Sequence, residues 1–344
     1  MNAEGKLVLV SLRKFLLNEI IQYIPTDERF LFHLKIRNKL LFFITFPQQY
    51  LGFVEKTLTE HSEWVSSVIE LSDGRIASGS ADSTIKIWDT QLGKSSQTLK
   101  GHNNAVTFLT ELKDEKIASA SADYTIKLWE LIDYTCIVTL TRHNSFIWTV
   151  IQLSDGNLLS GSQDYSIKLW DINTKQCIQT IDNAHNYYVY RCIELKDGRV
   201  VSCSGEEAVI NIWKRNNNES KFSKDSEFKE HKPYVCSLIQ LRDSCIASGD
   251  GNSLILVWNV DSRSVLFKLE GHTSVVWCLA QLDDGRLVSG SRDCSAIIWD
   301  LTEKKKCQVL KGDQGHTGTV RTTTQLKDKR IVTASDDKTF KIWY

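Results

Sequence analysis

This chain lacks the features that mark three common classes of protein. No apolar run approaches the roughly 18 residues that a membrane-spanning helix needs, and residues 40–46 make a run of only seven. The 42 basic residues are matched by 42 acidic ones, so the net charge is zero and favours neither nucleic acid nor a membrane surface as a partner. There is no phosphate-binding Gly loop, no nucleophile at motif spacing from a base and no cluster of metal ligands. We therefore expect no enzyme activity, no cofactor and no metal site.

Cysteine pairs at metal-binding or redox spacing are also missing. The nine cysteines are odd in number and scattered, with no Cys-x-x-Cys pair among them. This pattern favours free, largely buried thiols in a reducing compartment over disulfides or a zinc site. Glu4 precedes the first apolar stretch and Arg13-Lys14 interrupt it, which argues against a signal peptide. We expect a cytoplasmic or nuclear protein.

A histidine and a tryptophan recur together seven times along the chain. Their separation is 27 residues in six cases and 28 in the fourth, and successive histidines lie 41 to 46 residues apart. The pairs are His61–Trp88, His102–Trp129, His143–Trp170, His185–Trp213, His231–Trp258, His272–Trp299 and His316–Trp343. A period of about 40–45 residues indicates stacked supersecondary units.

Each unit has the pattern of four short strands. An apolar segment follows the histidine, and a turn such as Asp73-Gly74 leads into a segment such as IASGS. An Asp-centred turn then precedes alternating residues such as TIKIW, and a last short strand leads to the next histidine. Period-two alternation broken by Asp, Gly and Ser predicts strands and hairpins. Seven such units predict an all-β ring of seven small sheets.

Over residues 54–344 the chain resembles the WD-repeat β-propeller family. The resemblance rests on Gly-His and Trp-Asp pairs that recur in register: Gly101-His102, Gly271-His272, Gly315-His316, Trp88-Asp89, Trp170-Asp171 and Trp299-Asp300. It implies a seven-bladed propeller that serves as a non-enzymatic scaffold for partner proteins or peptides.

A hydroxyl and an acid accompany most of the His–Trp pairs. The hydroxyl lies ten residues before the tryptophan and the acid lies six before it. Because indole only donates, hydroxyl and imidazole both donate and accept, and carboxylate only accepts, a Trp–Ser–His–Asp relay closes with every donor used. The family's structural tetrad has these members. The complete sets are His61, Ser78, Asp82, Trp88; His102, Ser119, Asp123, Trp129; His143, Ser160, Asp164, Trp170; His272, Ser289, Asp293, Trp299; and His316, Thr333, Asp337, Trp343.

Units four and five depart from this spacing. In unit four Ser202 lies eleven residues before the tryptophan and Glu207 takes the acid position. In unit five Asn252 stands at the acid position. We expect a perturbed relay in unit four and a weakened one in unit five.

The two ends of the repeat region complement each other. Residues 51–58 have the pattern of a unit's last strand, with Leu58 three residues before His61, but no unit precedes them. The seventh unit stops one residue after Trp343 and lacks this strand. We therefore expect residues 53–58 to complete the seventh blade, within a propeller domain of residues 51–344.

Residues 1–50 contain no repeat and are predicted to form a separate helical segment. Residues 12–46 resemble an F-box, through Leu17, Glu19, Ile20, Tyr23, Ile24, Pro25, Asp27, Phe30, Leu34 and Leu40. The usual Leu-Pro opening is Leu16-Leu17 here, and the first helix is about one turn short. The resemblance implies an alternative function as the substrate-recognition subunit of a cullin-type ubiquitin ligase. A helical cap on the propeller or a dimerisation arm are the other interpretations.

Three tryptophans stand outside the His–Trp pairs, and all three follow a repeat histidine closely. Trp64 lies three residues after its histidine, and Trp148 and Trp277 lie five after theirs. These positions flank an apolar residue that we expect to point into the sheets, so alternation predicts that they face the channel and the top of the propeller. The same face is expected to carry Phe146, Tyr188, Tyr190, Tyr234, Arg292 and Arg321.

Aromatic residues and arginine are enriched at interface hot spots, so this face is the predicted partner-binding surface. Aromatic rings also accept a methylated or free cationic side chain through cation–π contacts. Arg191 and Lys232 join Arg292 and Arg321 near this face, which leaves phosphopeptide binding as a further interpretation. The alternative interpretation is that these aromatic rings pack between blades and bind no partner.

Overall fold

A computed structural model describes residues 54–344, except 91, 217–220, 233, 243–244 and 312–313. Contacts divide the chain into two units, Met1–Leu51 and Gly52–Tyr344. The helices and the F-box resemblance predicted within residues 1–50 lie outside the described residues. The part of the chain that the structure does describe contains no helix long and apolar enough to cross a bilayer.

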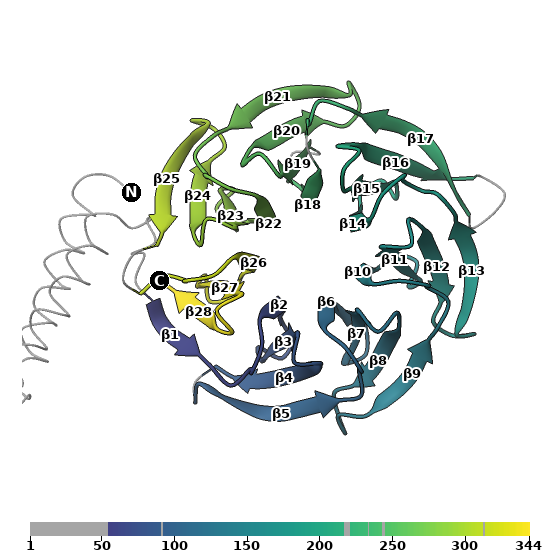
Figure 1. The fold of residues 1–344 in the computed structure, drawn as a ribbon, viewed down its shortest axis with the longest axis vertical. Helices are drawn as coiled ribbons and strands as arrows, with labels where there is room; N and C mark the ends of the chain where they lie inside the picture. Colours follow the sequence, from purple (N-terminus) through teal and green to yellow (C-terminus); the bar gives the residue numbers. More distant parts are fainter. Residues whose placement is uncertain (1–53, 91, 217–220, 233, 243–244, 312–313) are drawn as a thin grey trace, which may run out of the picture. The chain divides into compact units, whose positions relative to one another are not determined.

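The second unit is a ring of seven four-stranded antiparallel sheets (Figure 1), which confirms the predicted seven-bladed propeller. From the inner to the outer strand, the first four blades are β2 Val65–Glu70, β3 Ile76–Ser80, β4 Thr84–Asp89, β5 Lys94–Lys100; β6 Val106–Leu112, β7 Lys116–Ser121, β8 Ile126–Glu130, β9 Cys136–Leu140; β10 Ile147–Gln152, β11 Leu158–Ser162, β12 Ile167–Asp171, β13 Gln176–Ile181; and β14 Val189–Glu194, β15 Val200–Ser204, β16 Ile210–Arg215, β17 Phe222–Phe228. The last three blades are β18 Val235–Gln240, β19 Cys245–Asp250, β20 Ile255–Asn259, β21 Ser264–Leu269; β22 Val276–Gln281, β23 Leu287–Ser291, β24 Ala296–Asp300, β25 Lys305–Leu310; and β26 Val320–Gln325, β27 Ile331–Ser335, β28 Phe340–Trp343 with β1 Val54–Leu58.

Burial falls from the middle of each blade to its rim. The second strands β3 and β11 are buried at every position, because a neighbouring blade covers each face. The outermost strands β5 and β13 are mostly exposed or half-buried. The core is therefore made between blades, as where the Trp88 ring of blade one meets the Phe340 ring of blade seven edge-on at 4.9 Å between centroids.

Glycines in the second strands allow the blades to approach closely. A Cβ on Gly79 would lie 2.7 Å from the Val106 Cγ1 of the next blade, and one on Gly161 would lie 2.6 Å from Val189 Cγ1. Both distances are too short for real carbon contacts, so any side chain here would force the inner strand of the next blade away. The recurring Ser-Gly-Ser segments thus reflect a packing constraint.

The seventh blade is closed by the start of the described chain. Strand β1 pairs antiparallel with β28, with Val54 opposite Trp343 and Leu58 opposite Phe340. Leu58 is buried in the same cluster as Phe340. The predicted closing strand is confirmed over Val54–Leu58, and closure removes the open edge that β28 would otherwise present.

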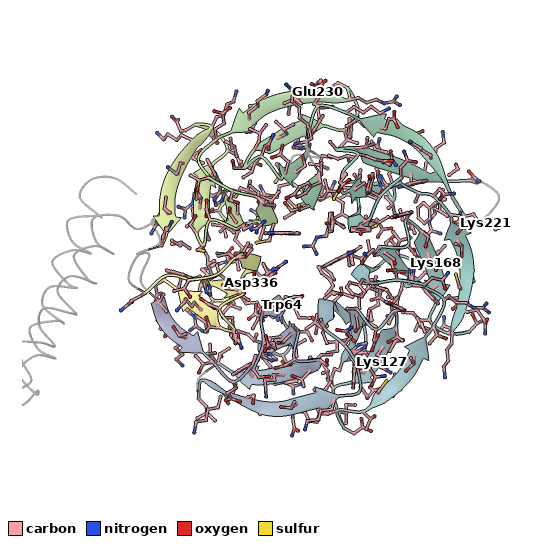
Figure 2. The ribbon with its side chains drawn as sticks, viewed as in Figure 1. Trp64, Lys127, Lys168, Lys221, Glu230 and Asp336 are labelled. Carbon is pink, nitrogen blue, oxygen red and sulfur yellow. The ribbon has the colours of Figure 1, made fainter. Side chains whose placement is uncertain are left out.

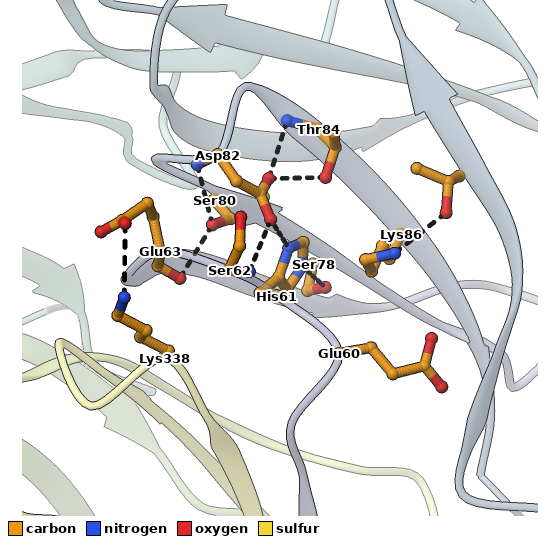
Figure 3. A network of polar contacts seen from close by, with 12 residues as sticks. Glu60, His61, Ser62, Glu63, Ser78, Ser80, Asp82, Thr84, Lys86 and Lys338 are labelled. Atoms are coloured by element: carbon orange, nitrogen blue, oxygen red, sulfur yellow. Dashed lines mark hydrogen bonds and ion pairs between the residues drawn. The ribbon is translucent and has the colours of Figure 1, made fainter.

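A buried polar relay lies inside blade one (Figure 3). His61 Nδ1 is 2.7 Å from Asp82 Oδ2, and His61 Nε2 is 2.7 Å from Ser78 Oγ. Trp88 Nε1 donates to the same Oγ at 2.7 Å. Because the indole must donate, the Ser78 hydroxyl donates to Nε2 and Nδ1–H donates to the carboxylate. The backbone N–H of Ser62 also donates to Asp82, at 3.1 Å. The relay therefore joins the loop before β2, strands β3 and β4, and the turn between them.

The same contacts recur around the ring. The four other complete sets have Nδ1–carboxylate distances of 2.7 or 2.8 Å, and each hydroxyl meets both its imidazole and its indole. In blade four Ser202 still bridges His185 and Trp213, at 2.7 and 2.8 Å, whereas Glu207 lies 3.5 Å from His185 Nδ1.

The expectation of a weakened relay in blade five is wrong. Asp250, not Asn252, contacts His231 Nδ1, at 2.8 Å, and Ser248 completes the relay to Trp258. Asp250 occupies the last position of β19, where blade one has Ser80, so its carboxylate reaches the imidazole from two residues earlier in the chain. Asn252 instead donates its backbone N–H to Asp250.

We expect ring closure to be required for cooperative unfolding. Deleting residues 1–58 removes β1, including Leu58. The edge of β28 and the core residues that Leu58 covers, such as Phe340, would then be exposed, so the single thermal transition should be lost. Deleting only residues 1–50 retains β1 and should preserve that transition. Calorimetry or circular dichroism on the two truncated chains measures this. An unchanged melt without residues 1–58 would contradict the role of β1.

We expect the Asp82 carboxylate to make stability depend on pH. Desolvation raises the pKa of Asp82, but hydrogen bonds from His61 and Thr84 outweigh it and hold the pKa well below its usual range. The unfolded carboxyl, with a pKa near 3.9, binds more protons in acid than the folded one. This stabilisation is therefore complete above about pH 5 and is lost as the pH falls through 4 and below.

Asp82→Asn should lower the free energy of unfolding at pH 7 by about 1–3 kcal/mol. It should also make the loss of stability between pH 5 and 3 shallower than in the parent chain. Urea denaturation across this range measures both effects, with Asp133→Asn, an exposed turn carboxylate, as the control. A variant whose acid slope equals that of the parent would show that the relay carboxylate is not the titrating group.

Candidate functional site

The loops of the propeller form two distinct faces. The loop that carries His61 and the turn that carries Asp82 meet on one side of blade one, which we call the upper face. The other loops meet on the lower face, where Arg75 donates to the Tyr134 hydroxyl at 2.7 Å. The predicted partner-binding residues follow the repeat histidines and so belong to the upper face and the channel.

The upper end of the channel holds a pocket of about 50 Å³, which we call the channel mouth. It is lined by Trp64, Ser66, Thr107, Phe108, Trp148, Tyr190, Arg191, Cys236, Trp277 and Arg321. Seven of these residues are the fifth after each repeat histidine, one from every blade. Figure 2 shows Trp64, together with Asp336, at the inner side of the ring, whereas Lys127 and Lys168 lie farther out. Five of the nine predicted partner-binding residues are therefore brought together here.

A β-bulge in every inner strand shapes this pocket. The pairing register shifts between Val65 and Ser67 in blade one, between Val106 and Phe108 in blade two, and at the equivalent position in the other five blades. A bulge sets two residues against one on the neighbouring strand and re-aims a side chain. Phe108 and Arg191, the sixth residues after their histidines, therefore line the mouth beside the fifth. Strict alternation did not predict Phe108, because the bulge is not visible as a break in period two.

The aromatic side chains of the mouth form a connected series. The Trp148 ring lies 6.3 Å from Phe146 and 5.5 Å from Tyr190, and Tyr190 lies 5.9 Å from Trp277, all edge-on. Tyr188 meets Tyr190 edge-on at 6.2 Å, so Phe146 and Tyr188 extend the series onto the upper rim. The rings pack against one another, yet those of the mouth remain partly exposed to the channel.

Tyr234 and Arg292, like Phe146 and Tyr188, lie outside the pocket lining. The half-buried Tyr234 ring packs closely over Gly251, where an added Cβ would lie 2.7 Å from the ring. Arg292 is exposed, and its charge acts on the Tyr234 hydroxyl. These two residues therefore belong to the upper rim and not to the mouth itself.

The two arginines of the mouth differ in their charge partners. The Arg321 guanidinium lies 4.9 Å from the Trp64 ring centroid and 5.1 Å from that of Trp277. Asp336 accepts from its Nε at 2.6 Å and its Nη2 at 3.1 Å, so its charge is neutralised. The Arg191 guanidinium lies 4.4 Å from the Phe108 ring centroid, and no described carboxylate forms an ion pair with it. Burial lowers the pKa of Arg191.

No catalytic or metal-binding constellation is found among the described residues. The repeat histidines have their ring nitrogens engaged in the relays, and no described group of three or more His, Cys, Asp or Glu side chains could hold a metal ion. The nine cysteines are free, and burial raises the pKa of Cys203 and of Cys278 to about 12. These thiols are therefore protonated at neutral pH and poorly nucleophilic.

Comparisons with known proteins match short segments of three curated relatives. The chain is 34% identical over 84 residues to cell division control protein 4 of Saccharomyces cerevisiae, covering 24% of this chain and 10% of that protein. It is 41% identical over 61 residues to small ribosomal subunit protein RACK1y of Oryza sativa subsp. japonica (17% and 18% covered). It is 36% identical over 72 residues to guanine nucleotide-binding protein subunit beta of Schizosaccharomyces pombe (20% and 23%). The matched segments thus span less than a quarter of each relative.

Similarity of fold extends over much more of the chain. The crystal structure of the WD40 β-propeller domain of Doa1 matches with a TM-score of 0.73, covering 85% of this chain and 96% of that domain, at 22% identity. A model of the family "WD domain, G-beta repeat" matches residues 52–89, 93–130, 134–171, 263–300 and 305–344. These ranges make up more than half of the sequence, and the chain therefore belongs to the WD40 repeat family.

Proposed function

We propose that this chain is a non-enzymatic scaffold that binds a segment of a partner protein on the upper face, over the channel mouth. The observation that carries the proposal is the cluster of three non-repeat tryptophans with Tyr190 around one pocket. Partly exposed aromatic side chains beside arginine are typical of interface hot spots. Family membership supports a scaffold, since the polar residues that recur in every blade are used for structure.

The relatives' names are consistent with a role in assemblies. One is named a small ribosomal subunit protein and another a subunit of a guanine nucleotide-binding protein. Those names describe the relatives and supply no partner for this chain.

The mouth does not favour a cationic ligand. The position between Trp64 and Trp277, where a methylated or free cationic side chain would make cation–π contacts, is occupied by the chain's own Arg321. Arg191 lies in the same pocket and would repel a second cation. An uncharged or acidic segment is the better match.

We expect the double substitution Trp148→Ala and Trp277→Ala to reduce partner recovery about tenfold or more, because hot-spot aromatics each contribute roughly 2 kcal/mol or more. The measurement is affinity purification of the full chain followed by quantitative mass spectrometry. Ile132→Ala, at a highly exposed apolar residue in the loop between β8 and β9, is the matched control on the lower face. A folded double variant that recovers the same proteins at the same level would place the binding surface elsewhere.

The alternative function, substrate recognition for a cullin-type ubiquitin ligase, depends on residues 12–46. We expect a receptor of this kind to recover a cullin and its adaptor only with the full chain, and not after removal of residues 1–48. Partners common to both forms would then be candidate substrates. If both forms recover the same proteins and no ligase component, the ligase function would be contradicted and only the scaffold function would stand.

A further inference from the structure

We propose that the channel mouth binds the carboxylate of an aspartate or glutamate from the partner segment, and that Arg191 is the residue that pairs with it. The inference rests on the proposed function, because it names the chemistry of the segment that would lie on the upper face. It is carried by the charge, the size and the hydrogen-bonding groups of the mouth.

Arg191 is a positively charged side chain that forms no ion pair with any described carboxylate. Its guanidinium lies against the Phe108 ring, and the bulge of β14 places it in the channel. It lines both the mouth and a second pocket of about 240 Å³ farther along the channel, whose other lining residues are apolar or uncharged. A guanidinium stays protonated in proteins, so burial without a partner carries a free-energy cost that an incoming carboxylate would relieve.

The charge balance of the mouth favours a monoanion. Asp336 neutralises Arg321, and at the upper rim Glu63 pairs with Lys338 at 3.3 Å. Arg191 therefore leaves one uncompensated positive charge. A single carboxylate would balance it, whereas a doubly charged phosphate would leave one negative charge beside lining residues that are otherwise apolar or uncharged.

The size of the mouth agrees with a short acidic side chain. One water-sized group needs about 10–15 Å³ by the same kind of measure, so 50 Å³ accommodates about four such groups. The terminal methylene and carboxylate of aspartate or glutamate contain four heavy atoms.

The hydroxyls of Ser66 and Thr107 in the mouth do not compete with Arg191 as donors. The Ser66 hydroxyl donates to the backbone carbonyl of Val106 in the next blade at 2.5 Å, and the Thr107 hydroxyl donates to that of Ile147. Arg191 is thus the charged donor left free in the lining. The carboxylate would accept its N–H groups, which is the pairing that guanidinium geometry favours.

The test uses the full chain and an immobilised library of random heptapeptides whose central residue is Asp, Glu, Asn, Gln, Arg or phosphoserine. We expect peptides centred on Asp or Glu to bind roughly tenfold to a hundredfold better than those centred on Asn or Gln. Arg191→Met should abolish this preference and Arg191→Lys should retain part of it. Arg242→Met, which removes an arginine from the lower face, should leave it unchanged.

Stability of the free chain gives an independent readout. Arg191→Met removes an unpaired cation and keeps a long apolar side chain against Phe108, so its melting temperature should equal or exceed that of the parent. A marked fall in melting temperature would mean that Arg191 has a structural role and would overturn the inference.

The outcomes separate the two proposals. In one outcome peptides bind, binding is lost in the Trp148→Ala and Trp277→Ala variant, and Asp or Glu is not preferred. This outcome would overturn the carboxylate proposal and leave the scaffold proposal standing. A preference for phosphoserine would replace the carboxylate by a phosphate. Peptide binding that is insensitive to those tryptophans, or no binding at all, would contradict both proposals.

Discussion

The hydroxyl that bridges an indole and an imidazole inside each blade is the interaction on which the rest of this structure depends. In blade one, Ser78 accepts the Trp88 N–H and meets His61, which in turn holds Asp82. The relay ties the loop before the first strand to the turn between the second and third strands. Because those segments form the upper face, the relays hold the surface that we propose binds a partner.

The polar residues that recur in each blade stabilise the fold, and other residues form the proposed binding surface. The His, Ser and Trp side chains that recur are buried, most of the Asp carboxylates are half-buried, and all of them are engaged with one another, so they have little remaining capacity to act on a ligand. The inner-strand positions that face the channel differ in residue type from blade to blade. At these positions the chain carries Trp148, Tyr190 and Trp277 beside Arg191. An unpaired cation weakens a fold, so its presence at this site is consistent with a binding role at some cost in stability.

Much of this architecture can be predicted from the sequence, because the repeat makes each blade a copy of the same solution. The spacing from His61 to Trp88 predicts the relay, and the surplus strand at residues 53–58 predicts the closure of the last blade. The fifth residues, such as Trp148, were correctly expected to face the channel, because alternation alone places them there.

The features that were not predicted arise where the local geometry leaves the repeat. Phe108 lines the mouth because a β-bulge adds one residue to the inner strand, and period two carries no sign of that bulge. In blade five the relay acceptor is Asp250 and not Asn252, because a carboxylate two residues earlier in the chain still reaches His231. Whether Arg191 has a carboxylate partner depends on which acidic residues lie near it in space. Separation along the sequence does not predict that.

The most direct test of this account is photo-crosslinking from the two faces of the full chain. Benzoylphenylalanine would replace Phe146 on the upper rim in one variant and Tyr134 on the lower face in the other. Both substitutions exchange one partly exposed aromatic residue for a reactive one. The account predicts partner crosslinks from position 146 and none from position 134. Crosslinks to the same partner only from position 134 would show that the lower face, and not the channel mouth, is the binding surface.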